Sequence, residues 1–135
     1  MDLTLSLRTA LPEFYSGWDP LNADIQQVLG YGCVLPLPGY DHHGRKVVLI
    51  RTAAHDPAVV KQALVQRVSF MTFEVMNMEE EQLFVMGIVL VFDFSGYTTN
   101  HFLAFPLADI KKSKLCWEVN SILYPFFIIH SNYIN

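Results

Sequence analysis

The sequence predicts an α/β fold with a mixed, mainly parallel sheet and helices packed on it. Residues 88–92, Ile-Val-Leu-Val-Phe, form an unbroken apolar run. Such a run is typical of a strand covered on both faces, as in a parallel sheet. The order along the chain is hairpin, helix, strand and helix, which also indicates the α/β class. Because ligands of α/β sheets bind beyond the carboxyl ends of the strands, the segment after Phe92 is the first place to look for function.

The first 32 residues predict little regular structure apart from one helix. Leu3–Arg8 reads as the end of a helix or strand. We interpret 11–15 and 18–20 as extended or turn segments, because proline disfavours helix in the residue before it. Residues 22–29 have apolar side chains at helical spacing. Asn22 is the expected cap, and Gly30 or Gly32 is the expected end.

A β-hairpin is predicted next. Residues 33–37 form a short strand, and Pro36 and Pro38 place it at a sheet edge. A turn rich in Gly and Asp follows at 39–45, and the second strand covers 47–51.

Two helices flank the central strand. Asp56-Pro57 is a signal for a helix start, and 63–75 carries apolar residues at spacings of three and four. We interpret the acidic run 79–81 as a solvated helix end. The second helix is expected over 108–118, with Lys111, Lys112 and Lys114 on its solvent side.

Composition narrows the function. The chain of 135 residues is one domain at most, with 52% hydrophobic and 16% charged residues. This apolar surplus predicts that some of it faces a ligand, a partner or a missing segment. The net charge of −4 argues against nucleic-acid binding. The two cysteines are interpreted as reduced core thiols of a cytoplasmic protein. The sequence has no convincing signal peptide and no unbroken apolar run of about 18 residues.

Catalytic and metal signatures are weak. His42 and His43 beside Asp41 suggest a metal or acid–base cluster, but we interpret them as a solvated hairpin tip because no partner has matching spacing. Asp93-Phe94-Ser95-Gly96 is not a nucleophile elbow, and Asp93 is expected to satisfy loop amides. There is no phosphate-binding loop. We therefore predict no enzyme activity, no catalytic residue, no metal and no cofactor.

The Met and aromatic residues of the first long helix have two interpretations. They form a core face, or they line a ligand cavity, and the apolar surplus favours the cavity more than usual. Ser69 and Thr72 lie in this stripe and could offer hydroxyls to an apolar ligand site. The alternative role of Ser69 is a hydrogen bond to the carbonyl of Val65. Composition alone predicts an apolar-ligand-binding or interaction module.

The punctuating residues resemble a known family. The pattern runs Gly39-x-Asp41-x-x-Gly44-Arg45-x-Val47-x-Leu49-x-Arg51, Asp56-Pro57, Gly87-Ile88-x-x-x-Phe92-Asp93-x-x-Gly96, His101 and Lys111-Lys112. It is similar to the CRAL-TRIO lipid-binding domain, and within that family to the insect clade related to α-tocopherol transfer protein and cellular retinaldehyde-binding protein. The segments 11–20 and 35–38 also fit, so the likeness covers roughly residues 8–118.

The resemblance implies a deep apolar cavity and the intracellular transfer of a tocopherol-, retinoid- or phospholipid-like ligand. It also implies peripheral contact with membranes through phosphoinositides such as phosphatidylinositol bisphosphate. It leaves the oligomeric state open. Carried over position by position, the ligand-binding residues are Ser69, Phe73, Ile88, Phe92, Thr99, Phe105 and Cys116.

Two departures from the family pattern predict a truncated member. Residues 1–32 read as a remnant of an amino-terminal helical region and linker, and 33–135 as a partial CRAL-TRIO domain. Within 119–135, Phe127 and Ile129 stand where the family often has basic side chains. The rival hypothesis is therefore a truncated, non-transferring fragment that acts as a protein-interaction remnant.

Overall fold

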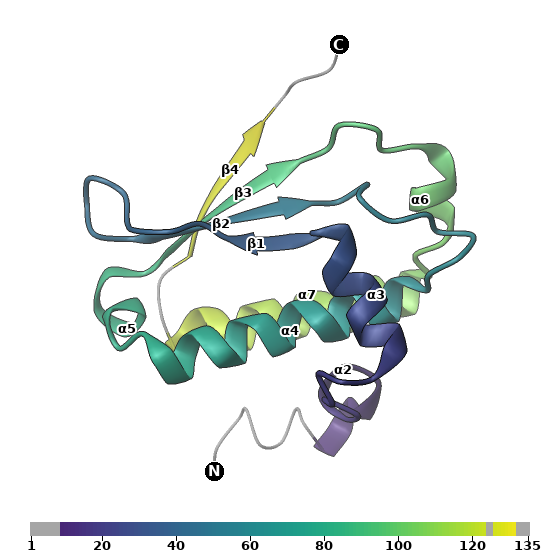
Figure 1. The fold of residues 1–135 in the computed structure, drawn as a ribbon, viewed down its shortest axis with the longest axis horizontal. Coiled ribbons are helices and arrows are strands. Elements are labelled where there is room, and N and C mark those ends of the chain that lie inside the picture. The colour runs from purple at the N-terminus through teal and green to yellow at the C-terminus, as the bar shows by residue number, and fades with distance from the viewer. Residues whose placement is uncertain (1–8, 124–125, 132–135) are drawn as a thin grey trace.

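A computed structural model describes residues 9–123 and 126–131, with side chains through residue 118 and at Ile128. The segment Leu3–Arg8 lies outside the described residues. Four strands form one sheet in the order β1-β2-β3-β4 (Figure 1). They are β1 (Val34–Pro36), β2 (Lys46–Arg51), β3 (Ile88–Asp93) and β4 (Phe126–Ser131). β1 and β2 are antiparallel, whereas β2, β3 and β4 are parallel, which confirms the predicted mixed, mainly parallel sheet.

Two long helices run together below the sheet in the view of Figure 1. They are α4 (Gln62–Glu79) and α7 (Leu107–Leu123), and both extend beyond the predicted helices. The rings of Phe70 and Phe73 on α4 lie 5.3 and 5.0 Å from the ring of Trp117 on α7. These contacts hold the two helices side by side.

The core joins this helical layer to the sheet. Val48 of β2 and Ile88 and Leu90 of β3 are at most 3% exposed and pack with Phe73 and Met76 of α4. Apolar burial of this kind contributes about 25 cal/mol for each Å² removed from water, so the shared cluster stabilises the two layers together. Val89, on the opposite face of β3, is 4% exposed, so β3 is covered on both faces at its amino-terminal end.

The amino-terminal helices follow local signals, with one correction. α3 (Ala23–Tyr31) begins after Asn22, whose Oδ1 accepts hydrogen bonds from the backbone N–H groups of Asp24 and Ile25. It ends at Gly32 in the left-handed conformation, as the sequence predicts. The prediction of extended chain at 11–15 is wrong, because α2 (Pro12–Tyr15) is helical. Proline is compatible with the first helical turn, where its missing N–H would have no partner.

The helix-start signal at Asp56-Pro57 is also wrong. Asp56 Oδ1 accepts a hydrogen bond from the Ala58 N–H, and the Asp56 carbonyl accepts from Val59 and Val60, so the motif forms an isolated turn. α4 begins six residues after Asp56, at Gln62, without a side-chain cap. Two short helices complete the fold, namely α5 (Gln82–Met86), which the sequence did not predict, and α6 (Thr99–Leu103).

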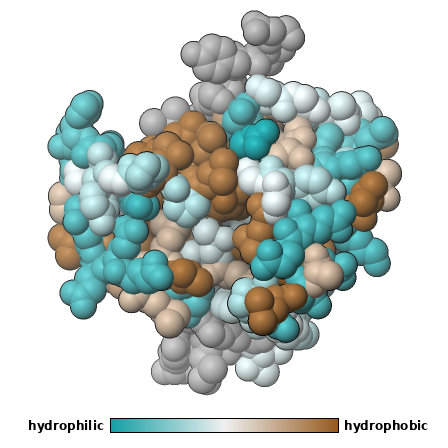
Figure 2. All heavy atoms as spheres, in the orientation of Figure 1, coloured by the Kyte–Doolittle hydropathy of each residue, from teal (hydrophilic) through white to brown (hydrophobic). Residues whose placement is uncertain are grey.

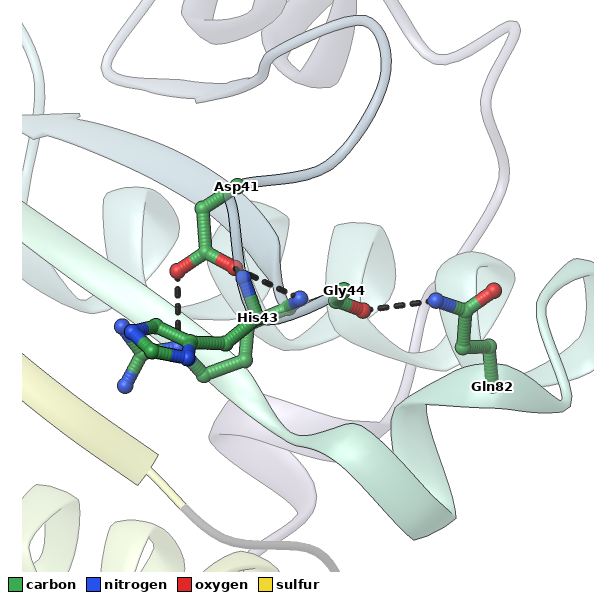
Figure 3. A network of polar contacts seen from close by, with 5 residues as sticks. Asp41, His43, Gly44 and Gln82 are labelled. Atoms are coloured by element: carbon green, nitrogen blue, oxygen red, sulfur yellow. Dashed lines mark hydrogen bonds and ion pairs between the residues drawn. The ribbon is translucent and has the colours of Figure 1, made fainter.

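The turn between β1 and β2 is tied down at two points (Figure 3). Asp41 Oδ1 accepts from the backbone N–H groups of His43 and Arg45, and its Oδ2 pairs with Arg45 Nε at 2.7 Å. Gln82 Nε2 donates to the Gly44 carbonyl over 2.6 Å, and a Cβ on Gly44 would stand 3.1 Å from that nitrogen. His42 and His43 are exposed at this turn.

The acidic run at the end of α4 is only partly solvated. Glu79 and Glu81 are exposed, but Glu80 Oε1 pairs with the buried Lys46 Nζ at 3.2 Å. Glu80 Oε2 also accepts a hydrogen bond from the Tyr40 hydroxyl at 3.1 Å. These bonds connect the hairpin to the end of α4, so the interpretation of 79–81 as a simple solvated end is wrong for Glu80.

Candidate functional site

A cavity of about 570 Å³ lies at the carboxyl ends of β2 and β3. Its volume is in the range of about 300–1,000 Å³ that holds a single small ligand. Its walls come from the sheet, from α4 and α7, and from the chain that follows β3. This is the position at which α/β sheets usually bind ligands.

Apolar side chains of the sheet form one wall. Ile50 lies near the end of β2, and Leu90 and Phe92 lie on β3, where their side chains share one face. Ile128 of β4 also lines the cavity and is 58% exposed, so the cavity reaches solvent near this strand. Val34 and the buried Cys33 complete this wall. Burial raises the pKa of the Cys33 thiol above its usual value, so it stays protonated at neutral pH.

The opposite wall is helical and contains uncharged polar groups. Ser113 Oγ of α7 donates a hydrogen bond to Gln66 Oε1 of α4 over 3.0 Å. Ser69 Oγ donates to the Val65 carbonyl over 2.8 Å, within α4. Gln62, Val65, Ile110 and Trp117 line the same wall.

A chain of aromatic rings closes the end of the cavity beyond β3. Phe92 and Phe94 stack with centroids 6.2 Å apart, Phe94 meets Tyr97 edge-on at 5.8 Å, and Tyr97 stacks on His101 at 5.3 Å. Phe105 lines the cavity after α6. Asp93 Oδ1 accepts from the Ser95 N–H, which confirms that Asp93 satisfies a loop amide; this bond lowers its pKa.

His101 ties this end of the cavity to the loop after β2. Its Nδ1 accepts a hydrogen bond from the backbone N–H of Thr98, so its Nε2 carries the ring proton and donates to the His55 carbonyl at 2.9 Å. His101 also lines a second cavity, of about 550 Å³, with His55 and Asp56. Burial lowers the pKa of His55, and the neighbouring His101 acts in the same direction. His55 is therefore neutral at physiological pH.

Charged side chains stand at the open edge of the cavity. Lys114 and Glu118 of α7 pair at 3.3 Å with side chains 76% and 59% exposed. Arg51 Nη1 donates to the Tyr31 carbonyl at 3.3 Å. Within residues 9–123 and 126–131, no three His, Cys, Asp or Glu side chains converge as metal ligands. In that part of the chain no helix is both long and apolar enough to cross a membrane.

The structure brings three of the predicted ligand residues to this cavity and places four elsewhere. Ser69, Phe92 and Phe105 line it. Phe73 and Ile88 lie in the core between α4 and the sheet, 2% and 0% exposed. Cys116 is fully buried beside Leu11, Phe14 and Phe70, on the side of α7 that packs against α2 and α4. Thr99 is exposed at the start of α6 and does not line the cavity.

Several lining residues were missed from the sequence, although one signal was present. Gln62, Gln66 and Ser69 are spaced by four and three residues, so they form a polar stripe on one face of an otherwise apolar helix. Such a stripe inside a core-facing helix indicates a polar wall. Ser113, Ile110 and Trp117 of α7 carry no comparable pattern.

Comparison with known proteins agrees with this geometry. A family model described as the CRAL/TRIO domain matches residues 31–128. The match runs from the end of α3 into β4 and so contains every cavity wall described above. No curated protein matches the chain.

Proposed function

Because the chain belongs to the CRAL/TRIO domain family, which binds small lipophilic ligands, we propose that the 570 Å³ cavity holds one such ligand for transfer between membranes. The observation that carries the proposal is the apolar wall of Ile50, Leu90 and Phe92 at the carboxyl ends of the strands. Apolar lining with a few placed polar groups is typical of small-ligand sites. A tocopherol- or retinoid-like molecule suits this volume better than a phospholipid with two acyl chains.

Two substitutions on α7 test the cavity. Ile110 lines it, whereas Leu107, one turn earlier, is 67% exposed and does not. Ile110→Trp should fill the cavity and reduce the retention of all-trans-retinol after gel filtration, and Leu107→Trp is the matched control. Equal retention by both variants, with circular dichroism showing both to be folded, would place the ligand elsewhere.

Peripheral membrane contact forms part of the proposal. Phe102 and Leu103 of α6 and Leu107 of α7 are 62%, 71% and 67% exposed, and they flank the cavity residue Phe105 in the sequence. β4 contains no Lys or Arg, and Phe127 and Ile129 occupy the expected basic positions. We therefore propose docking through apolar contact rather than selective binding of phosphatidylinositol bisphosphate.

A protein-interaction role is the second candidate. Met78 and Val85 are each 78% exposed, and Val75 is 51% exposed, so apolar side chains face solvent at the end of α4 and on α5. Figure 2 shows hydrophobic residues gathered in several places on one face of the molecule. Exposed apolar patches mark interaction sites or aggregation liabilities. A preparation that elutes as aggregate and retains no retinol would favour this candidate.

A further inference from the structure

Two uncharged polar side chains face each other in the helical wall of the cavity. Gln66 of α4 and Ser113 of α7 both line it, and the Ser113 hydroxyl donates to Gln66 Oε1 over 3.0 Å. Ser113 is 5% exposed, and Gln66 is half-buried. Burying polar groups is unfavourable unless they form hydrogen bonds. Each side chain therefore satisfies part of the other's hydrogen-bonding need.

The pair keeps hydrogen-bonding capacity for a third group. The Gln66 amide nitrogen carries two N–H donors, and it donates to no other residue that the structure describes. The Ser113 oxygen keeps lone pairs after donating its proton to Gln66. A ligand hydroxyl could accept from Gln66 and donate to Ser113, and a ligand carbonyl could accept from Gln66. The Ser69 hydroxyl differs, because its proton is already given to the Val65 carbonyl within α4.

The charged residues around the cavity do not reach the same environment. Lys114 and Glu118 are mostly exposed and pair with each other, and Arg51 is exposed and donates to the Tyr31 carbonyl. The buried part of the helical wall is thus polar but uncharged. A carboxylate placed there would lose its hydration without gaining a partner of opposite charge, which is strongly unfavourable.

Resting on the proposed function, we propose that Gln66 and Ser113 form a hydrogen-bonding anchor that selects a lipid with a neutral hydroxyl or carbonyl group. The anchor discriminates against a hydrocarbon, because such a ligand would strip water from the Gln66 amide without replacing its hydrogen bonds. Sites built to bond a polar group reject analogues that lack it for this reason. It also discriminates against an anionic lipid, for the reason of charge given above.

The test uses three radiolabelled probes with the same chain, namely hexadecanol, hexadecane and hexadecanoate, and measures their dissociation constants by equilibrium gel filtration. Hexadecanol should bind about threefold to tenfold more tightly than hexadecane, the range expected for one net hydrogen bond. Gln66→Met and Ser113→Ala should each bring this ratio close to one by weakening the alcohol only. The double variant should lose little more than either single variant, because the two residues act as one unit.

Controls separate the pair from general effects. Gln27→Met on the exposed part of α3 and Ser95→Ala in the turn after β3 make the same chemical changes away from the cavity, and they should leave the ratio unchanged. Equal binding of hexadecanol and hexadecane by the parent protein would overturn the anchor while leaving lipid binding intact. Tighter binding of hexadecanoate that Arg51→Gln abolishes would overturn it in favour of an anionic ligand. Failure to bind any of the three probes would overturn the proposed function itself.

Discussion

Glu13 Oε1 lies 2.7 Å from Lys112 Nζ, and this ion pair joins α2 to α7 across 99 positions of the sequence. Cys116 lies one turn further along α7 and is fully buried against Phe14 of α2. The ion pair thus sits at the edge of the apolar cluster that docks α2. Its two side chains are 43% and 32% exposed, so its contribution to stability is expected to be under about 1 kcal/mol.

This pair predicts an acid sensitivity. The hydrogen bond from Lys112 lowers the pKa of Glu13 below the model value of 4.5. A carboxyl group with a lowered folded-state pKa stabilises the fold above its unfolded-state pKa, and this stabilisation is lost as the pH falls through the folded-state pKa. Glu13→Gln should therefore reduce the free energy of unfolding at pH 7 but not at pH 2, as measured by urea denaturation. Glu118→Gln, in the more exposed pair with Lys114, is the control. Equal losses at both pH values would show that the charge is not the cause.

A second prediction concerns the central strand. Leu90 is 3% exposed between the sheet and α4, so Leu90→Ala should reduce the free energy of unfolding by about 2–5 kcal/mol, the range for deleting a buried leucine. Leu103→Ala, at a side chain that is 71% exposed, should change it by about 0.5 kcal/mol or less. The amides of β3 should exchange most slowly in the chain, and fast exchange across 88–92 would contradict the core described here.

The elements that were predictable have signals within one short stretch of sequence. Asn22 caps α3 and Gly32 ends it, and the run 88–92 became β3 because its own side chains fill both faces. The failures involve competition between local signals. Asp56 prefers a hydrogen bond to the Ala58 N–H over the start of a helix, and α5 is too short to show a period.

The cavity was only partly predictable because periodicity gives a face but not a position along it. Ile88 and Phe92 share a face of β3, yet they lie about 13 Å apart along the strand. Only Phe92 reaches the carboxyl end, where the cavity lies. Ser69 and Phe73 are likewise one helical turn apart on α4, and that turn moves Phe73 under Trp117 and out of the cavity.

The third prediction follows from this separation. Phe73→Leu should lower stability by less than the about 3–5 kcal/mol of a Phe→Ala change and should leave the affinity for all-trans-retinol unchanged, because Phe73 packs in the core. Phe105→Ser should leave stability nearly unchanged and weaken retinol binding, because Phe105 lines the cavity and is partly exposed. Fluorescence titration with retinol measures both. Weaker binding after Phe73→Leu in a fully folded sample would return Phe73 to the ligand site.

A fourth prediction concerns His101, which holds α6 at both ring nitrogens. His101→Ala removes the acceptor for the Thr98 N–H and the donor to the His55 carbonyl. Loss of a capping interaction costs about 0.5–2 kcal/mol, so the amides of 98–103 should exchange several-fold to about thirtyfold faster. Exchange in β3 should not change. Asn100→Ala, on the same short helix, is the control. Unchanged protection of 98–103 in His101→Ala would mean that packing alone holds α6.

The last prediction concerns adhesion to membranes. The chain carries a net charge of −4, and each basic residue near an anionic surface contributes only about 1 kcal/mol, so electrostatic attraction should be weak. The exposed side chains of Phe102, Leu103 and Leu107 should dominate instead. Co-sedimentation with phosphatidylcholine vesicles should therefore be weak, should change little between low and high salt, and should fall in Leu103→Gln. Val85→Gln removes an equally exposed apolar side chain from α5 and should have no such effect. Strong binding that requires phosphatidylinositol bisphosphate and disappears in salt would contradict apolar docking, because screening by salt acts on charges and not on buried apolar area.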